Sequence, residues 1–120
     1  MIIIKAKVNN IPSINTTYRR NERGVFKSKN VKEYQKIIKT YALVSMKNNK
    51  QQLFITPLEI EIIFYVKNIQ RDLDNMLKAT LDALQGIVFR NDNQIMIIHT
   101  YKQLSTDIVE NVEICIKELK

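Results

Sequence analysis

Three stretches of the chain alternate between hydrophobic and polar residues, with the period of two that is typical of β-strands. They cover residues 2–8, 58–66 and 109–116. The first has one polar face, whereas the second becomes hydrophobic on both faces towards its end, which predicts deeper burial there. A fourth strand is expected over Ile95–Tyr101, after a turn rich in Asn and Asp at residues 91–93.

One segment with hydrophobic residues at helical spacing runs from about Val31 to Met46. Ser28 or Asn30 precedes it and predicts the N-terminal cap of a helix. The predicted buried stripe of this helix consists of Val31, Tyr34, Ile37 or Ile38, Tyr41 and Val44.

A second helix is expected from Leu73 or Asp74 to Gln85, because Gly86 is a usual residue just past a helix end. Leucines at helical spacing indicate a face that packs on the core. The same stripe also suits part of a dimer interface, and the pattern does not separate the two. It consists of Leu73, Leu77, Leu81 and Leu84.

The predicted order of elements is β-α-β-α-β-β, which favours an α+β fold with a mixed β-sheet and two main helices. The chain has 120 residues, of which 45% are hydrophobic, so we expect a single domain over residues 1–120. Residues 9–30 are polar and contain Pro12 and Gly24, so they are expected to form a loop. Long loops in compact domains are usually functional.

The net charge of +7 favours a partner that is a polyanion, and nucleic acid is the most abundant one. A simpler interpretation is that the charge only keeps the protein dissolved. No hydrophobic run approaches the ~18 residues that a membrane helix requires. The first residues lack the features of a secretory signal, and the single cysteine cannot form an internal disulfide, so we expect a cytoplasmic protein.

Three carboxylates and one lysine stand out against this basic background. Asp72 and Asp74 lie in the sequence RDLDNMLK at residues 71–78, after a hydrophobic strand and at the start of a helix. Lys78 follows one helical turn later, and Asp92 lies in the loop before the next strand. If strand 95–101 lies beside strand 58–66, we expect the two loops to meet at one edge of the sheet.

Carboxylates that meet in this way are typical ligands of Mg²⁺, which activates water and stabilises the leaving oxygen in phosphodiester cleavage. Lys78 would then offset the charge on a phosphate oxygen. A purely structural interpretation also fits each residue alone. Asp74 would cap the helix, Asp72 and Asp92 would form turns, and Lys78 would pair with Asp74 or Asp82. The conjunction of all four favours the metal site.

The same residues resemble a known family. RDLDN at 71–75, the Lys78-Ala79 pair and Asn91-Asp92 are similar to motifs of the RusA family of Holliday junction resolvases, as is the PSINTTY stretch at 12–18. The resemblance covers essentially the whole chain and implies a RusA-like fold. It also implies a homodimer that uses Mg²⁺ or Mn²⁺ to resolve four-way DNA junctions by paired cuts.

Such enzymes are typically encoded by bacteria, phages or prophages, and the resemblance implies that Asp72, Asp74 and Asp92 bind the metal and catalyse, with Lys78 as the essential lysine. Two positions depart from the family pattern. Ile11 stands where a second proline often precedes Pro12, and Asn91 replaces a common aspartate. The latter change affects metal affinity rather than the assigned catalytic carboxylate.

We also expect a set of DNA-binding residues, most of them basic. In the predicted loop they provide the contacts to phosphates that make binding depend on salt, unless the loop is merely solvated. Tyr18 suits either stacking on an unpaired base or packing. Asn15 matches the family motif without an assigned chemical role. The set consists of Asn15, Tyr18, Arg19, Arg20, Arg23, Lys27, Lys29 and Arg71.

Two other functions remain open at this point. One is a non-catalytic DNA- or RNA-binding module whose aspartates are only caps and turns. The other is a metal-dependent nuclease that acts on flaps or single strands. Dependence on Mg²⁺ separates the module from both nucleases, and a comparison of substrates separates the nucleases from each other.

Overall fold

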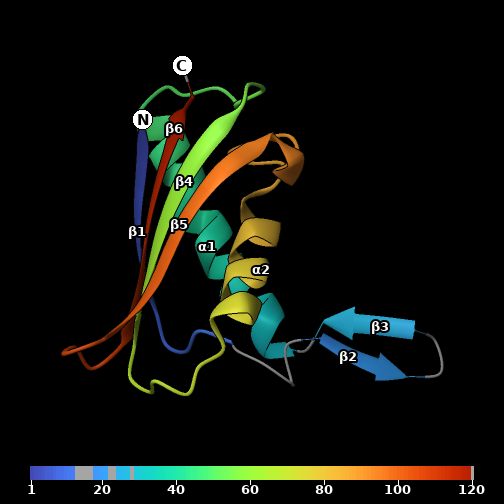
Figure 1. The fold of residues 1–120 in the computed structure, drawn as a ribbon, viewed down its shortest axis with the longest axis vertical. Helices are drawn as coiled ribbons and strands as arrows, with labels where there is room; N and C mark the ends of the chain where they lie inside the picture. The colour runs from blue at the N-terminus through green and yellow to red at the C-terminus, as the bar shows by residue number, and fades with distance from the viewer. Residues whose placement is uncertain (13–17, 22–23, 28, 120) are drawn as a thin grey trace.

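The computed structural model describes residues 1–12, 18–21, 24–27 and 29–119. The predicted α+β class is confirmed: a mixed four-stranded sheet packs against two helices. Figure 1 shows the elements, which are β1 (Ile2–Val8), β2 (Tyr18–Asn21), β3 (Gly24–Lys27), α1 (Lys29–Asn48), β4 (Leu58–Val66), α2 (Leu73–Leu84), the short 3₁₀ helix η2 (Asp92–Gln94), β5 (Ile95–Leu104) and β6 (Glu110–Glu118).

The main sheet has the strand order β1-β6-β4-β5. Strand β6 lies in the interior of the sheet and is antiparallel to both of its neighbours, β1 and β4. Strand β5 is parallel to β4, and α2 makes the connection between them. This parallel pairing places the end of β4 and the start of β5 at opposite ends of the sheet.

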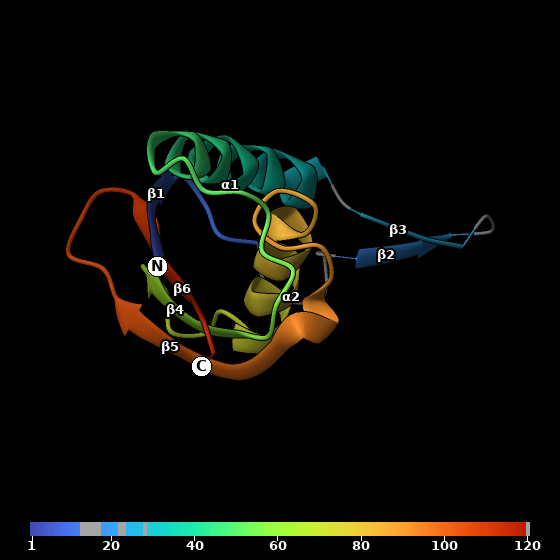
Figure 2. The same ribbon diagram turned by 90° about the horizontal axis from the view of Figure 1, so that it is seen from above.

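Both helices lie on the same face of the sheet, as Figures 1 and 2 show. The residues of β1 and β4 alternate in burial as predicted, so that every second side chain points into the core beneath the helices. Core residues of the sheet include Ile2, Ile4, Leu58, Ile60, Ile62, Phe64, Ile114 and Ile116.

Helix α1 begins earlier and ends later than predicted, and the second half of the predicted stripe is wrong. Tyr41 and Val44 are exposed, whereas Ala42 and Met46 are buried. From Tyr34 onwards, every fourth residue of α1 is buried, and Tyr41 and Val44 lie outside this series.

Helix α2 begins at Leu73 with Asp72 as its N-cap, and Gly86 follows its end with a φ of 88°, a conformation that glycine adopts without strain. Leu84 is buried, but the other three leucines of the predicted stripe are only half-buried. The most buried side of α2 instead contains Met76, Ala79, Thr80 and Ala83.

The contact between the two helices includes a buried polar pair. The hydroxyl groups of Tyr34 and Thr80 lie 2.6 Å apart, and Gln35 Nε2 donates to the carbonyl of Ala79 at 2.9 Å. Burial raises the pKa of Tyr34, so its hydroxyl stays protonated. These bonds fix how α2 is rotated and therefore which way its N-terminus faces.

Strands β2 and β3 form a two-stranded antiparallel sheet within the segment that was predicted to be a loop. Figure 1 shows this hairpin beyond the N-terminal end of α1, outside the main sheet. Backbone pairing of four residues in each strand, from Tyr18–Lys27 to Asn21–Gly24, replaces the expected irregular structure.

Candidate active site

The first two carboxylates lie where the loop of residues 67–72, called the Asp72 loop below, enters α2. Oδ1 of Asp72 accepts hydrogen bonds from the backbone N–H groups of Asp74 at 3.0 Å and Asn75 at 3.4 Å. The orientation of Asp72 is therefore fixed by its role as the helix cap. The side chain of Asp74 is exposed and makes no hydrogen bond or ion pair with the described part of the chain.

This pair is chemically suited to a hard divalent cation. Mg²⁺ typically uses one or two protein carboxylates and fills its remaining positions with water and substrate phosphate. Asp72 and Asp74 supply two carboxylates within one helical turn of each other, and the exposed oxygens of Asp74 are accessible to a metal ion. The N-terminus of α2 also presents a positive partial charge that attracts an anionic phosphate.

Asp92 lies at the other end of α2. The register of the parallel strands pairs Leu58 with Ile95 at one end of the sheet and Val66 with Leu104 at the opposite end. The Asp72 loop follows Val66, whereas Asp92 lies three residues before Ile95, so about 18 Å of helix separates Asp72 from the turn of Asp92. The expectation that the two loops meet within one chain is wrong, because β4 and β5 are parallel.

Within residues 1–12, 18–21, 24–27 and 29–119, no three acidic, histidine or cysteine side chains are grouped closely enough to bind one metal ion. This agrees with the separation of the third aspartate from the first two. A site that uses all three predicted carboxylates is therefore not complete in a single copy of the chain.

The turn that carries Asp92 is stabilised by its own residues and by bonds from Gln94 Nε2 to the carbonyls of Phe54 at 2.9 Å and Thr56 at 3.0 Å. Oδ1 of Asn91 accepts from the N–H of Asn93 at 2.9 Å, and Oε1 of Gln94 accepts from the N–H of Asn91 at the same distance, which makes a capping box. The N–H of Asp92 donates to Oε1 of Gln85 at 3.2 Å. Asp92 itself is exposed to solvent.

Lys78 lies one helical turn after Asp74, on the exposed side of α2. It lies in the middle of α2, and its role in catalysis stays a prediction. Asp82 follows one turn later and is half-buried. Both residues also make interactions within the chain.

Arg71, predicted to bind DNA, makes intramolecular contacts instead of projecting into solvent. Nη1 donates to the carbonyl of Ile11 at 2.8 Å, and Nη2 contacts Oδ1 of Asn10. Nη2 also lies 3.2 Å from Oε1 of Glu110, and only 22% of the Arg71 side chain is exposed. Its role in DNA binding stays a prediction that nothing in this geometry supports.

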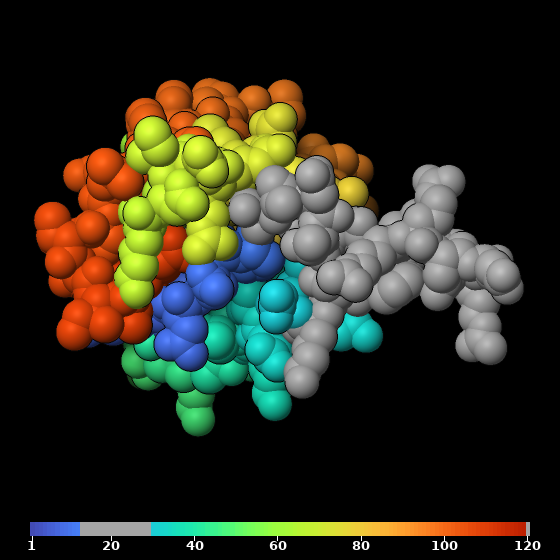
Figure 3. Space-filling view, turned by 90° about the horizontal axis from the view of Figure 1, so that it is seen from below, coloured from blue at the N-terminus to red at the C-terminus, as the bar shows by residue number. Residues whose placement is uncertain are grey.

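Two residues that sequence reasoning missed also contact the Asp72 loop. Lys102 of β5 donates from Nζ to the carbonyls of Ile69 at 2.6 Å and Arg71 at 2.8 Å. Glu110, at the start of β6, accepts from the N–H of Lys67 at 2.8 Å. Figure 3 shows this loop, in yellow-green, next to the blue segment 9–12.

The other predicted DNA-binding residues fall mainly in the hairpin. Tyr18, Arg19 and Arg20 belong to β2, Lys27 belongs to β3, and Lys29 is the first residue of α1. Asn15 and Arg23 lie outside the described residues. Four basic residues of the prediction are thus placed on one hairpin or directly after it.

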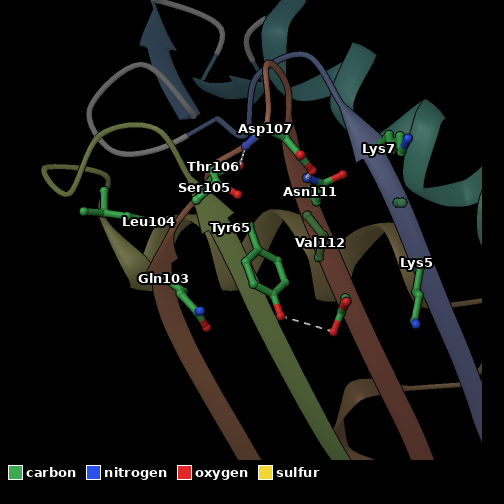
Figure 4. A pocket seen from close by; sticks show the side chains of 12 residues that line it. Lys5, Lys7, Tyr65, Gln103, Leu104, Ser105, Thr106, Asp107, Asn111 and Val112 are labelled. Atoms are coloured by element: carbon green, nitrogen blue, oxygen red, sulfur yellow. Dashed lines mark hydrogen bonds between the residues drawn. The ribbon is translucent and has the colours of Figure 1, made fainter.

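The outer face of the sheet carries a shallow hollow that contains none of the predicted catalytic residues (Figure 4). Lys5, Lys7 and Asn111 line it beside Tyr65, whose hydroxyl donates to Oε2 of Glu113 at 3.4 Å. Partial burial and the nearby Glu113 carboxylate raise the pKa of Tyr65. No helix in the described ranges has the length and hydrophobicity needed to cross a membrane.

Comparison with known families matches residues 8–117 to the family model described as endodeoxyribonuclease RusA. The matched region begins at the end of β1 and ends within β6, so it contains both helices and all four predicted catalytic residues. No curated protein matches the chain.

Proposed function

The chain belongs to the RusA family of endodeoxyribonucleases, and from this premise we propose that it resolves Holliday junctions by paired symmetric nicks that require Mg²⁺. Membership in the family implies a junction-resolving endonuclease. The dependence on Mg²⁺, for which Mn²⁺ substitutes, and the pairing of the two nicks are our proposal.

The observation that carries this proposal is the carboxylate pair at the N-terminus of α2. Asp72 and Asp74 would bind the metal, which when present generates hydroxide from water at neutral pH and polarises the scissile phosphate. Asp72 contributes one oxygen in a fixed direction, because its other oxygen caps the helix. Asp74 contributes a carboxylate whose oxygens face solvent and substrate.

Lys78 and the first turn of α2 would orient the substrate. The backbone N–H groups of a helix N-terminus attract phosphate, and they lie beside the carboxylate pair. Lys78 adds a positive charge one turn further along the same helix, where it offsets negative charge that develops on a nonbridging phosphate oxygen. Without this charge the two carboxylates would repel the DNA backbone.

The separation of Asp92 supports a homodimer in which each site uses carboxylates from both copies. One copy would supply Asp72 and Asp74, and the second copy would supply Asp92. Two-fold symmetry then produces two identical sites, which suits two symmetric nicks in a two-fold junction. The distance along α2 leaves no way for one copy to bring the three residues together without refolding.

Strand β5 is the surface best suited to this dimer. It lies at the end of the sheet, so one side of its backbone has no strand partner in the described chain. Long hydrophobic edge strands tend to pair with another chain. The hydrophobic residues exposed on β5 include Met96 (66%), Ile97, Ile98, Tyr101 and Leu104 (58%).

Pairing of β5 with its counterpart across a two-fold axis would be antiparallel. The Ile95 end of one strand would then lie beside the Leu104 end of the other. The Leu104 end adjoins the Asp72 loop, because the N–H of Ser105 donates to the carbonyl of Val66 at 2.7 Å. The partner's Asp92 would therefore approach the carboxylate pair, which is the arrangement that the metal site needs.

The basic hairpin would contact the DNA backbone. Arg19, Arg20 and Lys27 lie on β2 and β3, outside the main sheet, in a chain of net charge +7. Contacts from such residues to phosphates supply affinity without sequence preference, which is what recognition of a junction by its shape requires.

The first test is incubation of the protein with a labelled four-way junction and with a matched linear duplex, in Mg²⁺ and in EDTA. We expect paired nicks in the junction alone and only with metal. Binding of the junction without cleavage under every divalent metal tried would favour the non-catalytic DNA-binding module, in which Asp72 serves only as the helix cap.

Mixing two inactive variants tests the shared site. In a dimer of an Asp74→Asn chain and an Asp92→Asn chain, one composite site has lost both residues and the other site is intact. We therefore expect the mixture to regain nicking of one strand per junction, without paired cuts. If each copy held its own complete site, every site in the mixture would lack one carboxylate and no activity would return.

A further inference from the structure

Glu110 is a buried carboxylate that the proposed cleavage does not use. It is the first residue of β6, and its side chain is completely inaccessible to solvent. A buried ionised carboxylate is costly unless it is paired and hydrogen-bonded, so its contacts show what it is there to organise.

Both oxygens of Glu110 accept hydrogen bonds from the backbone. Oε1 accepts from the N–H of Ile11, and Oε2 accepts from the N–H of Lys67, each at 2.8 Å. Oε1 also lies 3.2 Å from Nη2 of Arg71. One carboxylate thus joins three segments that are far apart in the sequence, and we call Glu110, Arg71, Ile11 and Lys67 the Glu110 cluster.

The Glu110 cluster fixes the Asp72 loop at both of its ends. Lys67 is the first residue of this loop, and Arg71 is the residue directly before the metal-binding Asp72. The guanidinium of Arg71 is itself anchored to the carbonyl of Ile11 at 2.8 Å. A loop that is attached at both ends has little freedom to change the position of the residue that follows it.

We propose that Glu110 is a positioning residue for the carboxylates at the N-terminus of α2. By fixing Lys67 and Arg71, it sets where Asp72 and Asp74 stand relative to each other and to the helix end, and so it sets the affinity of the site for a divalent metal. This inference rests on the proposed metal site, and Glu110 itself touches neither metal nor substrate.

The position of the cluster also explains how the two motifs of the family resemblance are joined in space. Pro12, which begins the first motif, follows Ile11, and Arg71 begins the second motif. Both Ile11 and Arg71 contact Glu110. A residue outside either motif therefore connects them.

The test substitutes Glu110→Gln, which keeps the size of the side chain. The amide presents only one acceptor oxygen, so one of the two backbone N–H groups loses its bond, and the ion pair with Arg71 is lost. Glu113→Gln is the matched control, because Glu113 lies on the same strand but faces the outer side of the sheet.

The decisive readout is Mn²⁺ binding by the free protein, followed by electron paramagnetic resonance. Residues that orient metal ligands typically change metal affinity by about 10- to 100-fold when they are removed. We expect the Mn²⁺ Kd to rise by about tenfold or more in Glu110→Gln. We expect no change in Glu113→Gln, and no change in junction binding in EDTA for either variant.

Two further measurements separate positioning from a general loss of stability. Amide hydrogen exchange should rise in residues 67–75 of Glu110→Gln while exchange in β1 and β4 stays as in the unsubstituted protein. Cleavage should recover at high Mg²⁺ concentration, because the defect lies in metal affinity. A merely destabilised protein would show faster exchange throughout and would not regain activity with added metal.

An unchanged Mn²⁺ Kd in folded Glu110→Gln, beside a wild type that binds Mn²⁺ and cleaves junctions, would overturn this inference and leave the proposed function intact. A wild type that neither binds Mn²⁺ nor cleaves would overturn both. If Glu110→Gln does not fold, Arg71→Lys replaces it, because lysine keeps the charge beside Glu110 but loses the forked contacts to Ile11 and Asn10. The same rise in Kd is then expected, and its absence has the same meaning.

Discussion

The two ends of α2 carry the proposed catalytic carboxylates in contrasting ways. At the N-terminal end, the Asp72 loop is bonded to three other parts of the chain through Glu110, Arg71 and Lys102. At the C-terminal end, Asp92 sits on an exposed turn that is held by its own capping box, by Gln85, and by Gln94, which donates to the carbonyls of Phe54 and Thr56.

This difference suits a metal site that is divided between two copies of a small protein. The end proposed to bind the metal with two residues is fixed within its own chain, so the geometry of the pair would not depend on a partner. The end that delivers a single carboxylate is exposed and accessible to another molecule. In the proposed dimer, each copy would therefore supply one rigid carboxylate pair and one exposed carboxylate for the site of the other copy.

The largest effect is expected from removing a carboxylate at each end of α2 in turn. We expect Asp74→Asn and Asp92→Asn each to lower junction cleavage on the order of a thousandfold, because metal-assisted stabilisation is worth several kcal/mol. Binding of the junction in EDTA should be retained. Initial rates of nicking measure the effect, and Asp107→Asn is the control, since Asp107 is an exposed carboxylate in the loop between β5 and β6.

Near-normal cleavage by Asp92→Asn, beside an inactive Asp74→Asn, would contradict the proposal that both ends of α2 contribute carboxylates to the site. It would leave the N-terminal pair as the whole metal site and remove the reason for a shared one.

The next test prevents two copies from pairing, so that Asp92 of one copy cannot reach the carboxylate pair of the other. A lysine on an edge strand disfavours pairing with another strand, so Met96→Lys should convert the proposed dimer to a monomer at micromolar concentration and remove most cleavage. Light scattering after size-exclusion chromatography measures the mass. Leu43→Lys is the matched control, since Leu43 is a similarly exposed hydrophobic residue on α1.

A dimer that survives in Met96→Lys but dissociates in Leu43→Lys would move the interface to α1. The partner's Asp92 would then need another route to the carboxylate pair.

A smaller effect is expected from the hairpin, which belongs to neither end of α2. Replacing Arg19, Arg20 and Arg23 together with glutamine should weaken junction binding. The slope of log affinity against log salt should become shallower by roughly 0.9 for each phosphate contact that is lost. Fluorescence anisotropy at several salt concentrations measures the slope, and an unchanged slope would exclude these side chains from the DNA contact.

The smallest effect concerns the capping box at the Asp92 end. Asn91→Asp restores the residue that is common in the family and keeps a side chain that caps equally well, so the free energy of unfolding should change by less than about 0.5 kcal/mol. Asn91→Ala should instead cost about 1 kcal/mol. Urea denaturation compares the two, and equal losses would show that the cap contributes nothing to this end.

The sequence predicted the four strands of the main sheet and both helices because their cues are local, whereas the hairpin of β2 and β3 was expected to be a loop. Alternation in β1 and β4 and the glycine after α2 each act over a few residues. The parallel pairing of β4 and β5 was missed, although a signal for it exists. A helix between two neighbouring strands returns the chain to its starting end, so the second strand runs parallel to the first.

The contacts of Glu110 could not be predicted from the sequence, and the reason is physical. Its hydrogen-bond partners are backbone N–H groups of Ile11 and Lys67, and every residue except proline carries such a group. The residue types at these two positions therefore give no signal of the contact with Glu110. In the sequence, Glu110 is one acidic residue before an alternating strand, and only the fold shows that it is buried.

The interior position of β6 also has a consequence for how the domain forms during synthesis. Ile2 pairs with Ile116, so β1 is made long before its only strand neighbour in the described sheet exists. At ribosomal rates of about 5–20 residues per second, the delay is on the order of ten seconds. Such distant pairing slows folding, and a nascent chain would gain its nuclease geometry only after β6 emerges.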